Sequence, residues 1–395
     1  MKIKRAAKRK WVLKLLFLML GPLGLALAWG TAAIPAGIEY FYSLRFSKSL
    51  ASFLSLTSGI FPFSLAEVLV VLLVLLLLIG IISVTVKSLI SLLKIWHPRS
   101  RKSLGKERPR FRQKTVGFLA YTYRAIVLLG VIYFSFILIW GLNYNRLSFA
   151  EIAGLEVQES SVEELAELSG RLIARANELR LSLPEDSRGV FQLEGGFEAV
   201  RTLAPLALAK AGEIYPELKG NFGRPKPVFL SELMSYTGIT GIYFPFTGEA
   251  NVNVDIPDSQ LPATTCHELA HQRGFAREDE ANYIAWVACN LSEEPAFQYS
   301  GVQMALIYAM NALYEHAPEK ALELQQQYSP QVARDLKHIS EYWKKYEGKA
   351  EEVVSDINDA YLKSNRQAEG VQSYGRMVDL LLAEQKADRE KRMLP

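Results

Sequence analysis

Cysteine and histidine are scarce in this sequence, with two and five residues among 395. Two cysteines exclude a scaffold built on disulfides and a cysteine-based zinc finger. Half of the residues are hydrophobic, which excludes a chain that is disordered throughout. The sequence therefore predicts a folded protein that is long enough for two domains.

Acidic residues are nearly absent from the first 114 positions, which hold 19 Lys and Arg but only Glu39, Glu67 and Glu107. The rest of the chain holds 26 basic and 38 acidic residues. The chain thus has a basic, apolar first part and an acidic second part. Because the positive charge lies beside long apolar runs and not on a folded domain, nucleic acid is not an expected partner.

Three long windows without a charged side chain lie within the first 144 residues. About 20 helical residues cross the roughly 30 Å core of a bilayer. We therefore expect transmembrane helices over about residues 15–38, 66–87 and 124–144, with the lipid bilayer as a partner. Pro35 interrupts the first window, and the basic flank before it also resembles the start of a signal peptide. An uncleaved anchor is expected, with cleavage after Ala28 as the alternative.

Positive charge predicts the orientation of these helices. The first ten residues hold six Lys and Arg, and residues 87–114 hold ten against one acid, whereas residues 39–64 hold only two. Positively charged loops stay in the cytoplasm. We therefore expect a multi-pass protein of the cell membrane with a cytoplasmic N-terminus and a cytoplasmic basic loop at 88–114. The expected domains are a membrane region over 1–144 and an extracytoplasmic domain over 145–395.

Helical patterns dominate the second part. Apolar residues repeat at helical spacing over residues 165–179, and the pattern is helical again from about residue 260 to the end. Residues 251–254 alternate polar and apolar side chains, as a half-buried strand does. We expect an α-rich α+β fold in which a domain with a small sheet follows the three transmembrane helices. The aromatic segment 41–64 is expected either along the outer membrane interface or against that domain.

The most informative motif of the chain is HELAH, which begins at His267. On a helix, His267 and His271 lie one turn apart on the same face, where both imidazoles can bind one Zn²⁺. Glu268 stands beside that face, in the position of a general base that takes a proton from zinc-bound water. Pro262 suits the first turn of this helix, and Gly274 suits its end.

A hydrolytic zinc site needs a third protein ligand and one open position. The segment EDEAN at residues 278–282 begins seven residues after His271. A turn at Gly274 allows a second helix to start near this segment and to bring its first turn back to the histidines. A metzincin pattern fails, because Arg277 stands where that pattern needs a His or Asp ligand.

HELAH followed by EDEAN resembles the gluzincin metallopeptidases, in which HExxH precedes E-x-x-A/S-D on the next helix. The resemblance implies a zincin-like domain with Glu278 as the third zinc ligand, while Glu280 stays open as the alternative. Asn282 takes the place of the Asp that supports a ligand histidine, and the insert between the two motifs is shorter than usual. In that group a strand corresponding to residues 249–254 pairs with the substrate backbone.

The whole chain also resembles an uncharacterised family of bacterial membrane proteins, which carries the signature HELAHQ-x-GF-x-x-E-x-EAN after three N-terminal spans. The resemblance includes GLNY at 141–144 and SYGRMVDLL at 373–381. It implies the architecture but no substrate. Tyr374 and Arg376 are candidate donors to the oxyanion of an attacked carbonyl. The favoured interpretation is that they cap and flank the last helix.

These features predict a membrane-anchored, zinc-dependent metallopeptidase that hydrolyses peptide bonds on the extracytoplasmic face. His267, His271 and Glu278 would bind Zn²⁺, Glu268 would act as the base, and a peptide or protein would be the substrate. One alternative is a non-catalytic membrane sensor or scaffold that retains a zinc-binding zincin domain. Another is a hydrolase of non-peptide amides with the same metal chemistry.

Overall fold

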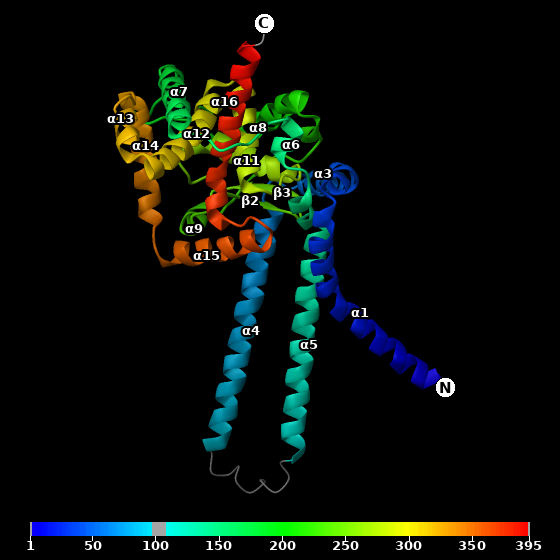
Figure 1. The fold of residues 1–395 in the computed structure, drawn as a ribbon. Helices are drawn as coiled ribbons and strands as arrows, with labels where there is room; N and C mark the ends of the chain where they lie inside the picture. The colour runs from blue at the N-terminus through cyan, green and yellow to red at the C-terminus, as the bar shows by residue number, and fades with distance from the viewer. Residues whose placement is uncertain (1, 97–107, 394–395) are drawn as a thin grey trace. The chain divides into compact units, whose positions relative to one another are not determined.

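The computed structural model of the chain describes residues 2–96 and 108–393 (Figure 1). Helices dominate, and the described residues include one sheet of three short strands. The chain divides into two compact units, the first formed by residues 1–30 and 66–138 and the second by residues 31–65 and 139–395. The α-rich fold with a small sheet and three long apolar helices, which the sequence predicts, is confirmed.

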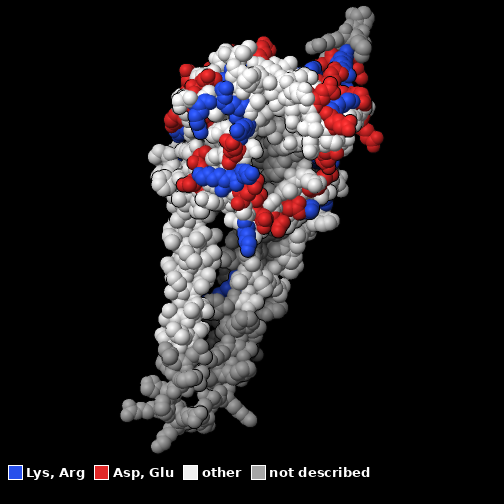
Figure 2. Space-filling view, turned by 90° about the vertical axis from the view of Figure 1, so that its left-hand side faces the viewer, with Lys and Arg blue, Asp and Glu red and all other residues white. Residues whose placement is uncertain are grey.

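Three long helices supply the first unit: α1 (Lys2–Gly30), α4 (Leu65–Trp96) and α5 (Arg108–Ile139). The stretches long and apolar enough to cross a membrane are Val12–Ala33, Leu65–Ile90 and Thr122–Ile139. Their side chains are almost all unburied by protein, which suits helices surrounded by lipid. Figure 2 shows one face, on which charged side chains gather on the second unit and are nearly absent from the described part of the long helices.

Three helices of membrane length therefore agree with the predicted spans, while their orientation stays a prediction. Residues 97–107 of the predicted basic loop lie outside the described residues. The third apolar helix ends at Ile139 and not at residue 144. Residues Gly141–Asn145 form a buried 3₁₀ helix instead, in which the Asn143 amide donates to Ser47 Oγ at 2.9 Å. The polar side chains after Ile139 thus find protein partners within the second unit.

Residues 31–65 begin the second unit with short helices: η1 (Thr31–Ala33), α2 (Pro35–Gly37), the π-helix η2 (Ile38–Ser47) and α3 (Lys48–Ser58). Lys48 Nζ donates to the Glu217 carbonyl at 2.9 Å, and Ser64 Oγ donates to Asn251 Oδ1 at 2.6 Å. Of the two predicted locations for residues 41–64, the structure thus shows packing against the folded domain. Aromatic side chains such as Phe53 nevertheless stay exposed.

Further helices build the body of the second unit: α6 (Phe149–Ala153), α7 (Val162–Arg180), α8 (Gly196–Ile214), α9 (Ser231–Ser235), α10 (Leu261–Gln272), α11 (Glu278–Leu291), α12 (Pro295–His316), α13 (Pro318–Gln325), α14 (Pro330–Tyr346), α15 (Lys349–Ser364), η7 (Gly370–Arg376) and α16 (Met377–Met393). The helix α7 starts with a capping box between Ser161 and Glu164. Its apolar side, including Leu172 and Ile173, is buried in one continuous core with α10, α11 and α12.

The sheet consists of β1 (Lys226–Pro227), β2 (Gly241–Phe244) and β3 (Glu249–Val252), in the order β1-β3-β2. The strand β3 lies in the centre, parallel to β1 and antiparallel to β2, with Ile242 opposite Asn251. Because β3 is paired on both sides and fully buried, it cannot take up a substrate strand. The expectation that residues 249–254 pair with a substrate backbone is therefore wrong, and the edges of this sheet are β1 and β2.

Candidate metal centre

The helix α10 carries the HELAH motif, and Pro262 and Gly274, the predicted start and end signals, lie at its two ends. Pro262 lies in its first turn, and the chain leaves the helix at Gly274, whose N–H donates to the His271 carbonyl at 2.8 Å. Gly274 has φ +86°, and an added Cβ would also meet Asn143 Oδ1 at 3.2 Å. Glycine is required here because a side chain would strain the backbone and crowd its neighbour. The turn then delivers α11 back against α10.

Three potential ligand atoms converge between α10 and α11. Oε2 of Glu278 lies 3.2 Å from His267 Nε2 and 3.3 Å from His271 Nε2. The two imidazole rings stand edge to face, with centroids 4.6 Å apart. All three residues are buried, and their ligand atoms lie within 4.8 Å of one another. The structure thus brings together the two histidines and the first carboxylate of the EDEAN segment.

Hydrogen bonds at the far side of each ring orient the imidazoles. His267 Nδ1 lies 2.8 Å from Asn282 Oδ1, and His271 Nδ1 lies 2.7 Å from the Phe275 carbonyl oxygen. Because both partners accept, each Nδ1 carries a proton, and Nε2 is the ring atom that each histidine turns toward Glu278. The Asn282 amide is itself fixed, since its Nδ2 donates to the Tyr374 carbonyl at 3.1 Å.

Glu280, the alternative ligand, faces elsewhere. Its Oε1 accepts a hydrogen bond from the Phe149 N–H at 3.0 Å and lies 3.4 Å from Arg277 Nε. This buried carboxylate therefore holds the start of α6 and is absent from the group of converging ligand atoms in the described residues. Of the two predicted candidates, Glu278 is the one that lies beside both histidines.

The charges at this centre depend on one another. Burial alone would raise the pKa of Glu278, but the adjacent imidazoles hold it at about 2. Burial alone would lower the pKa of His271, but the Glu278 carboxylate raises it to about 9. Two nitrogen lone pairs and a carboxylate oxygen at this separation repel one another unless a cation, either a proton or a metal ion, lies between them.

Glu268 lies beside these atoms at the base of a pocket. Its side chain is buried, and its Oε2 has no hydrogen-bond partner among the residues that the structure describes. Burial raises the pKa of Glu268 above its usual range. The carboxyl group lies close against β2, because a Cβ added to Gly241 would meet Glu268 Oε1 at 2.5 Å. Only glycine leaves room for this carboxylate.

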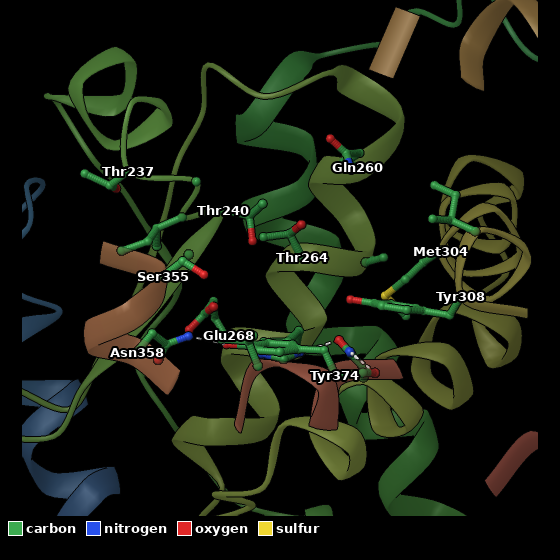
Figure 3. Close-up of a pocket in the computed structure, with 18 of the residues that line it drawn as sticks. Thr237, Thr240, Gln260, Thr264, Glu268, Met304, Tyr308, Ser355, Asn358 and Tyr374 are labelled. Atoms are coloured by element: carbon green, nitrogen blue, oxygen red, sulfur yellow. Dashed lines mark hydrogen bonds between the residues drawn. The ribbon is translucent and has the colours of Figure 1, made fainter. Parts of the chain in front are cut away.

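The pocket has a volume of about 490 Å³ and is lined by both His267 and Glu268. Figure 3 shows Met304 and Tyr308 of α12 on one side and Ser355 and Asn358 of α15 on the opposite side. Glu268 and Tyr374 lie between these two walls (Figure 3). The candidate metal centre thus borders a space large enough for several residues of a peptide or for a small molecule.

Tyrosine side chains that sequence reasoning ranked low or missed line this pocket. The Tyr374 ring stacks on His267 with centroids 6.3 Å apart, and its hydroxyl lies 3.5 Å from Asn358 Nδ2. Burial raises the pKa of Tyr374 well above its usual range and that of Tyr308 to about 12, so both phenols keep their protons near neutral pH. Arg376 instead pairs with acids outside the pocket.

Arg146 supports the turn after α10. This role of Arg146 is one that the sequence analysis missed. Its guanidinium donates to both carboxylate oxygens of Glu39, at 2.8 and 2.6 Å, and to the Gly274 carbonyl at 3.0 Å. It also lies 3.8 Å from the centre of the Phe275 ring. Because Phe275 supplies the acceptor for His271, this buried ion pair helps to fix one imidazole. A lone Arg and a lone Glu, 107 positions apart, gave no sequence signal.

No curated protein and no solved structure matches this chain. A family model does match, over residues 42–382, and the match includes the candidate metal centre and the pocket that borders it. The resemblance to an uncharacterised family is thereby confirmed at the level of the family, whose description carries no activity. The chain belongs to the family described as Protein of unknown function (DUF3810).

Proposed function

We propose that the second unit is a zinc-dependent peptidase, which the apolar helices anchor in the cell membrane with the pocket on the extracytoplasmic side. The observation that carries the proposal is the convergence of His267 Nε2, His271 Nε2 and Glu278 Oε2 beside a pocket with a buried Glu268. The distribution of positive charge in the first part supports the orientation.

The donor set fits zinc. Two imidazole nitrogens and one carboxylate oxygen are the ligands of many catalytic zinc ions, which keep a further position open. Oε2 of Glu278 is buried and accepts no hydrogen bond from the described residues, as expected of an atom that faces a cation. A bound zinc ion would lower the pKa of a water molecule to about 7 and polarise the carbonyl under attack.

In this proposal Glu268 moves the proton. Its raised pKa suits a carboxyl group that takes a proton from the attacking water and then donates it to the leaving nitrogen. Tyr374 and Tyr308 keep their hydroxyl protons and line the same pocket, so they are suited to donate hydrogen bonds to the carbonyl oxygen.

The edge strand β2 supports a peptide as the substrate. Among the described strands, β2 pairs only with β3, and its first residue, Gly241, lines the pocket together with Thr240. An extended peptide can therefore add to the sheet beside Glu268, with affinity from the backbone and little sequence preference. In this proposal β2 has the substrate-pairing role that the sequence analysis expected of residues 249–254.

The direct test uses the purified full chain and four variants. We expect stoichiometric zinc in the wild type, in Glu268→Gln and in Glu280→Gln, and loss of zinc in His267→Ala and in Glu278→Gln. Cleavage of a peptide library should be lost in Glu268→Gln although its zinc is retained. The absence of zinc from the wild type, or equal cleavage by Glu268→Gln, would refute the proposal.

A sensor or scaffold that binds zinc without catalysis is the second candidate, and Asn282 favours it. A neutral amide supports His267 less strongly than a carboxylate would, which lowers metal affinity. A purely structural zinc site, however, needs no buried carboxylate such as Glu268 at the base of a pocket. Zinc binding without hydrolysis of any peptide or other amide would decide for this candidate.

A further inference from the structure

Exposed apolar side chains gather on two segments of the second unit. The helix α15 exposes Val353 and Ile357, which lie one turn apart on the same side and are 56% and 63% exposed. The segment around α9 exposes Phe229 and Leu233, at 91% and 61%. Single exposed apolar residues are ordinary on a protein surface, whereas several around one site mark an interaction surface. We call these four side chains the apolar rim.

Both segments of the apolar rim border the pocket. The opposite side of α15 lines the pocket through Ser355 and Asn358, and the residues after α9 line it through Thr237 and Gly238. Figure 3 shows Thr237 and Ser355 on the same side of the pocket. The two segments touch there, because a Cβ added to Gly238 would meet Glu351 Cγ at 3.1 Å. The apolar rim therefore flanks one side of the pocket.

One hydrogen bond ties α15 to the 3₁₀ helix Gly141–Asn145, which follows the third apolar stretch in the sequence. Tyr361, one turn after Ile357, accepts a hydrogen bond from Tyr144 at 3.1 Å. Tyr144 comes five residues after Ile139, where the third apolar stretch ends. At about 1.5 Å of rise per residue, Ile357 lies only about 6 Å along α15 from this contact.

The strand β1, which precedes the α9 segment in the sequence, is tied to the residues just before the second apolar stretch. Lys226 Nζ donates to the carbonyls of Ser58, Phe61 and Phe63, and the second apolar stretch begins at Leu65. Phe229 follows Lys226 by three residues, so it lies within about 10 Å of it. Both parts of the apolar rim thus stand close to points where the chain meets the membrane.

A bilayer covers such a surface. The headgroup region is several ångströms deep and accepts apolar and aromatic side chains from proteins at its edge. The residues between the first and second apolar helices carry further exposed aromatic side chains of this kind: Tyr40, Phe41, Phe46, Phe53, Phe61 and Phe63. They lie in the segment that leads into the second apolar stretch, which begins at Leu65.

We infer that the apolar rim lies in the headgroup region of the bilayer, so that the pocket opens at the membrane surface. Its substrates are then polypeptide segments held at that surface, in lipid-anchored or membrane-spanning proteins, and not freely diffusing peptides. The placement of the rim is independent of catalysis, whereas the statement about substrates rests on the proposed peptidase function.

The placement is tested on the full chain in phosphatidylcholine vesicles. Ile357→Cys and Leu233→Cys are each labelled with an environment-sensitive fluorophore; the native Cys266 and Cys289 are fully buried. Leu322→Cys on α13 is the matched control, because this leucine is 52% exposed but lies outside the pocket lining. Lipid-borne spin labels should quench the rim labels several-fold more than the control, and aqueous iodide should quench them less. Equal quenching at all three positions would overturn the inference.

The substrate class is tested with one peptide that is offered free or attached to a lipid through a short linker. The variant carrying Val353→Glu and Ile357→Glu should cleave the attached peptide about tenfold more slowly than the wild type, because the effective concentration at the pocket falls. Cleavage of the free peptide should not change. Equal slowing of both peptides would refute the substrate class. Failure of the wild type to cleave either peptide would refute the peptidase function, and the fluorescence result would still decide the placement.

Discussion

Asn282 connects the candidate metal centre to the pocket wall, and its replacement gives the sharpest test of how the site is held. Its amide accepts from His267 Nδ1 at 2.8 Å and donates to the Tyr374 carbonyl at 3.1 Å. Asn282→Ala removes both contacts. Loss of a partner that orients a metal-binding histidine costs about 10- to 100-fold in metal affinity. Because the buried groups that Asn282 contacts would lose a hydrogen-bond partner, the free energy of unfolding should fall by about 1–3 kcal/mol.

Asn282→Asp separates the two contacts. A carboxylate still accepts from His267, so zinc affinity should be at least that of the wild type. It has no proton for the Tyr374 carbonyl, and two acceptor oxygens would then face each other in a buried place. We therefore expect Asn282→Asp to bind zinc tightly but to unfold at a lower temperature than the wild type.

The assay measures the zinc dissociation constant by competition with a chelator and the unfolding temperature of the same samples. Asn290→Ala is the control, because this asparagine lies on the same helix and, among the described residues, donates only to the Trp286 carbonyl of its own helix. Zinc affinity in Asn282→Ala equal to that in Asn290→Ala would refute the reasoning. So would unchanged stability in Asn282→Asp.

Three further predictions test other contacts. Gly241→Ala should displace the Glu268 carboxylate by about 1 Å and reduce peptide cleavage about 100-fold, with zinc retained. Gly348→Ala is the control, because no atom lies within 4 Å of the new Cβ, and it should match the wild type in cleavage and in zinc content. Arg146→Met leaves the buried Glu39 carboxylate without its partner, so calorimetry should show that the free energy of unfolding falls by about 3–5 kcal/mol. Part of this loss should return when Glu39→Gln is added. Burial, reinforced by the charge of Arg146, lowers the pKa of Lys48 to about 8. Because the folded state then binds this proton less tightly than the unfolded state, stability should rise between about pH 8 and 10.5 in the wild type, relative to Lys48→Met.

Local signals in the sequence predicted the parts of the structure that local physics determines. Long windows without charge became the apolar helices, and Pro262 and Gly274 bounded the helix that carries HELAH. Glu278 and Glu280 illustrate the limit of such reasoning. They lie about 200° apart around one helix, so only one can face the histidines, and the packing of α11 on α10 decides which.

Contacts between distant segments carried no signal in a single sequence. Arg146 pairs with Glu39, and Lys226 donates to the Phe61 carbonyl. Both contacts join segments more than 100 positions apart. The role of the strand at 249–252 was misjudged for the same reason. Its alternating pattern fits a sheet, but the order of the strands depends on residues 226–227, which flank it in space and not in sequence.

The departure of Asn282 from the gluzincin pattern has a physical account in this fold. An aspartate would serve His267 well but would have no proton for the carbonyl of Tyr374. The amide satisfies both neighbours, and it thereby joins the histidine to the segment that carries a tyrosine of the pocket. Asn282 thus gives His267 a neutral partner and at the same time fixes the pocket wall at Tyr374.

The second unit is discontinuous along the chain, and this affects how it can be produced and studied. A soluble version that begins at residue 145 would lack Glu39, leaving the Arg146 charge buried alone, and would uncover the surface beneath α3. During synthesis, residues 31–65 can pack into their unit only after residues 139–395 have left the ribosome. An excised domain should therefore fold only if that segment is supplied, either as a separate peptide or joined by a linker that replaces α4 and α5.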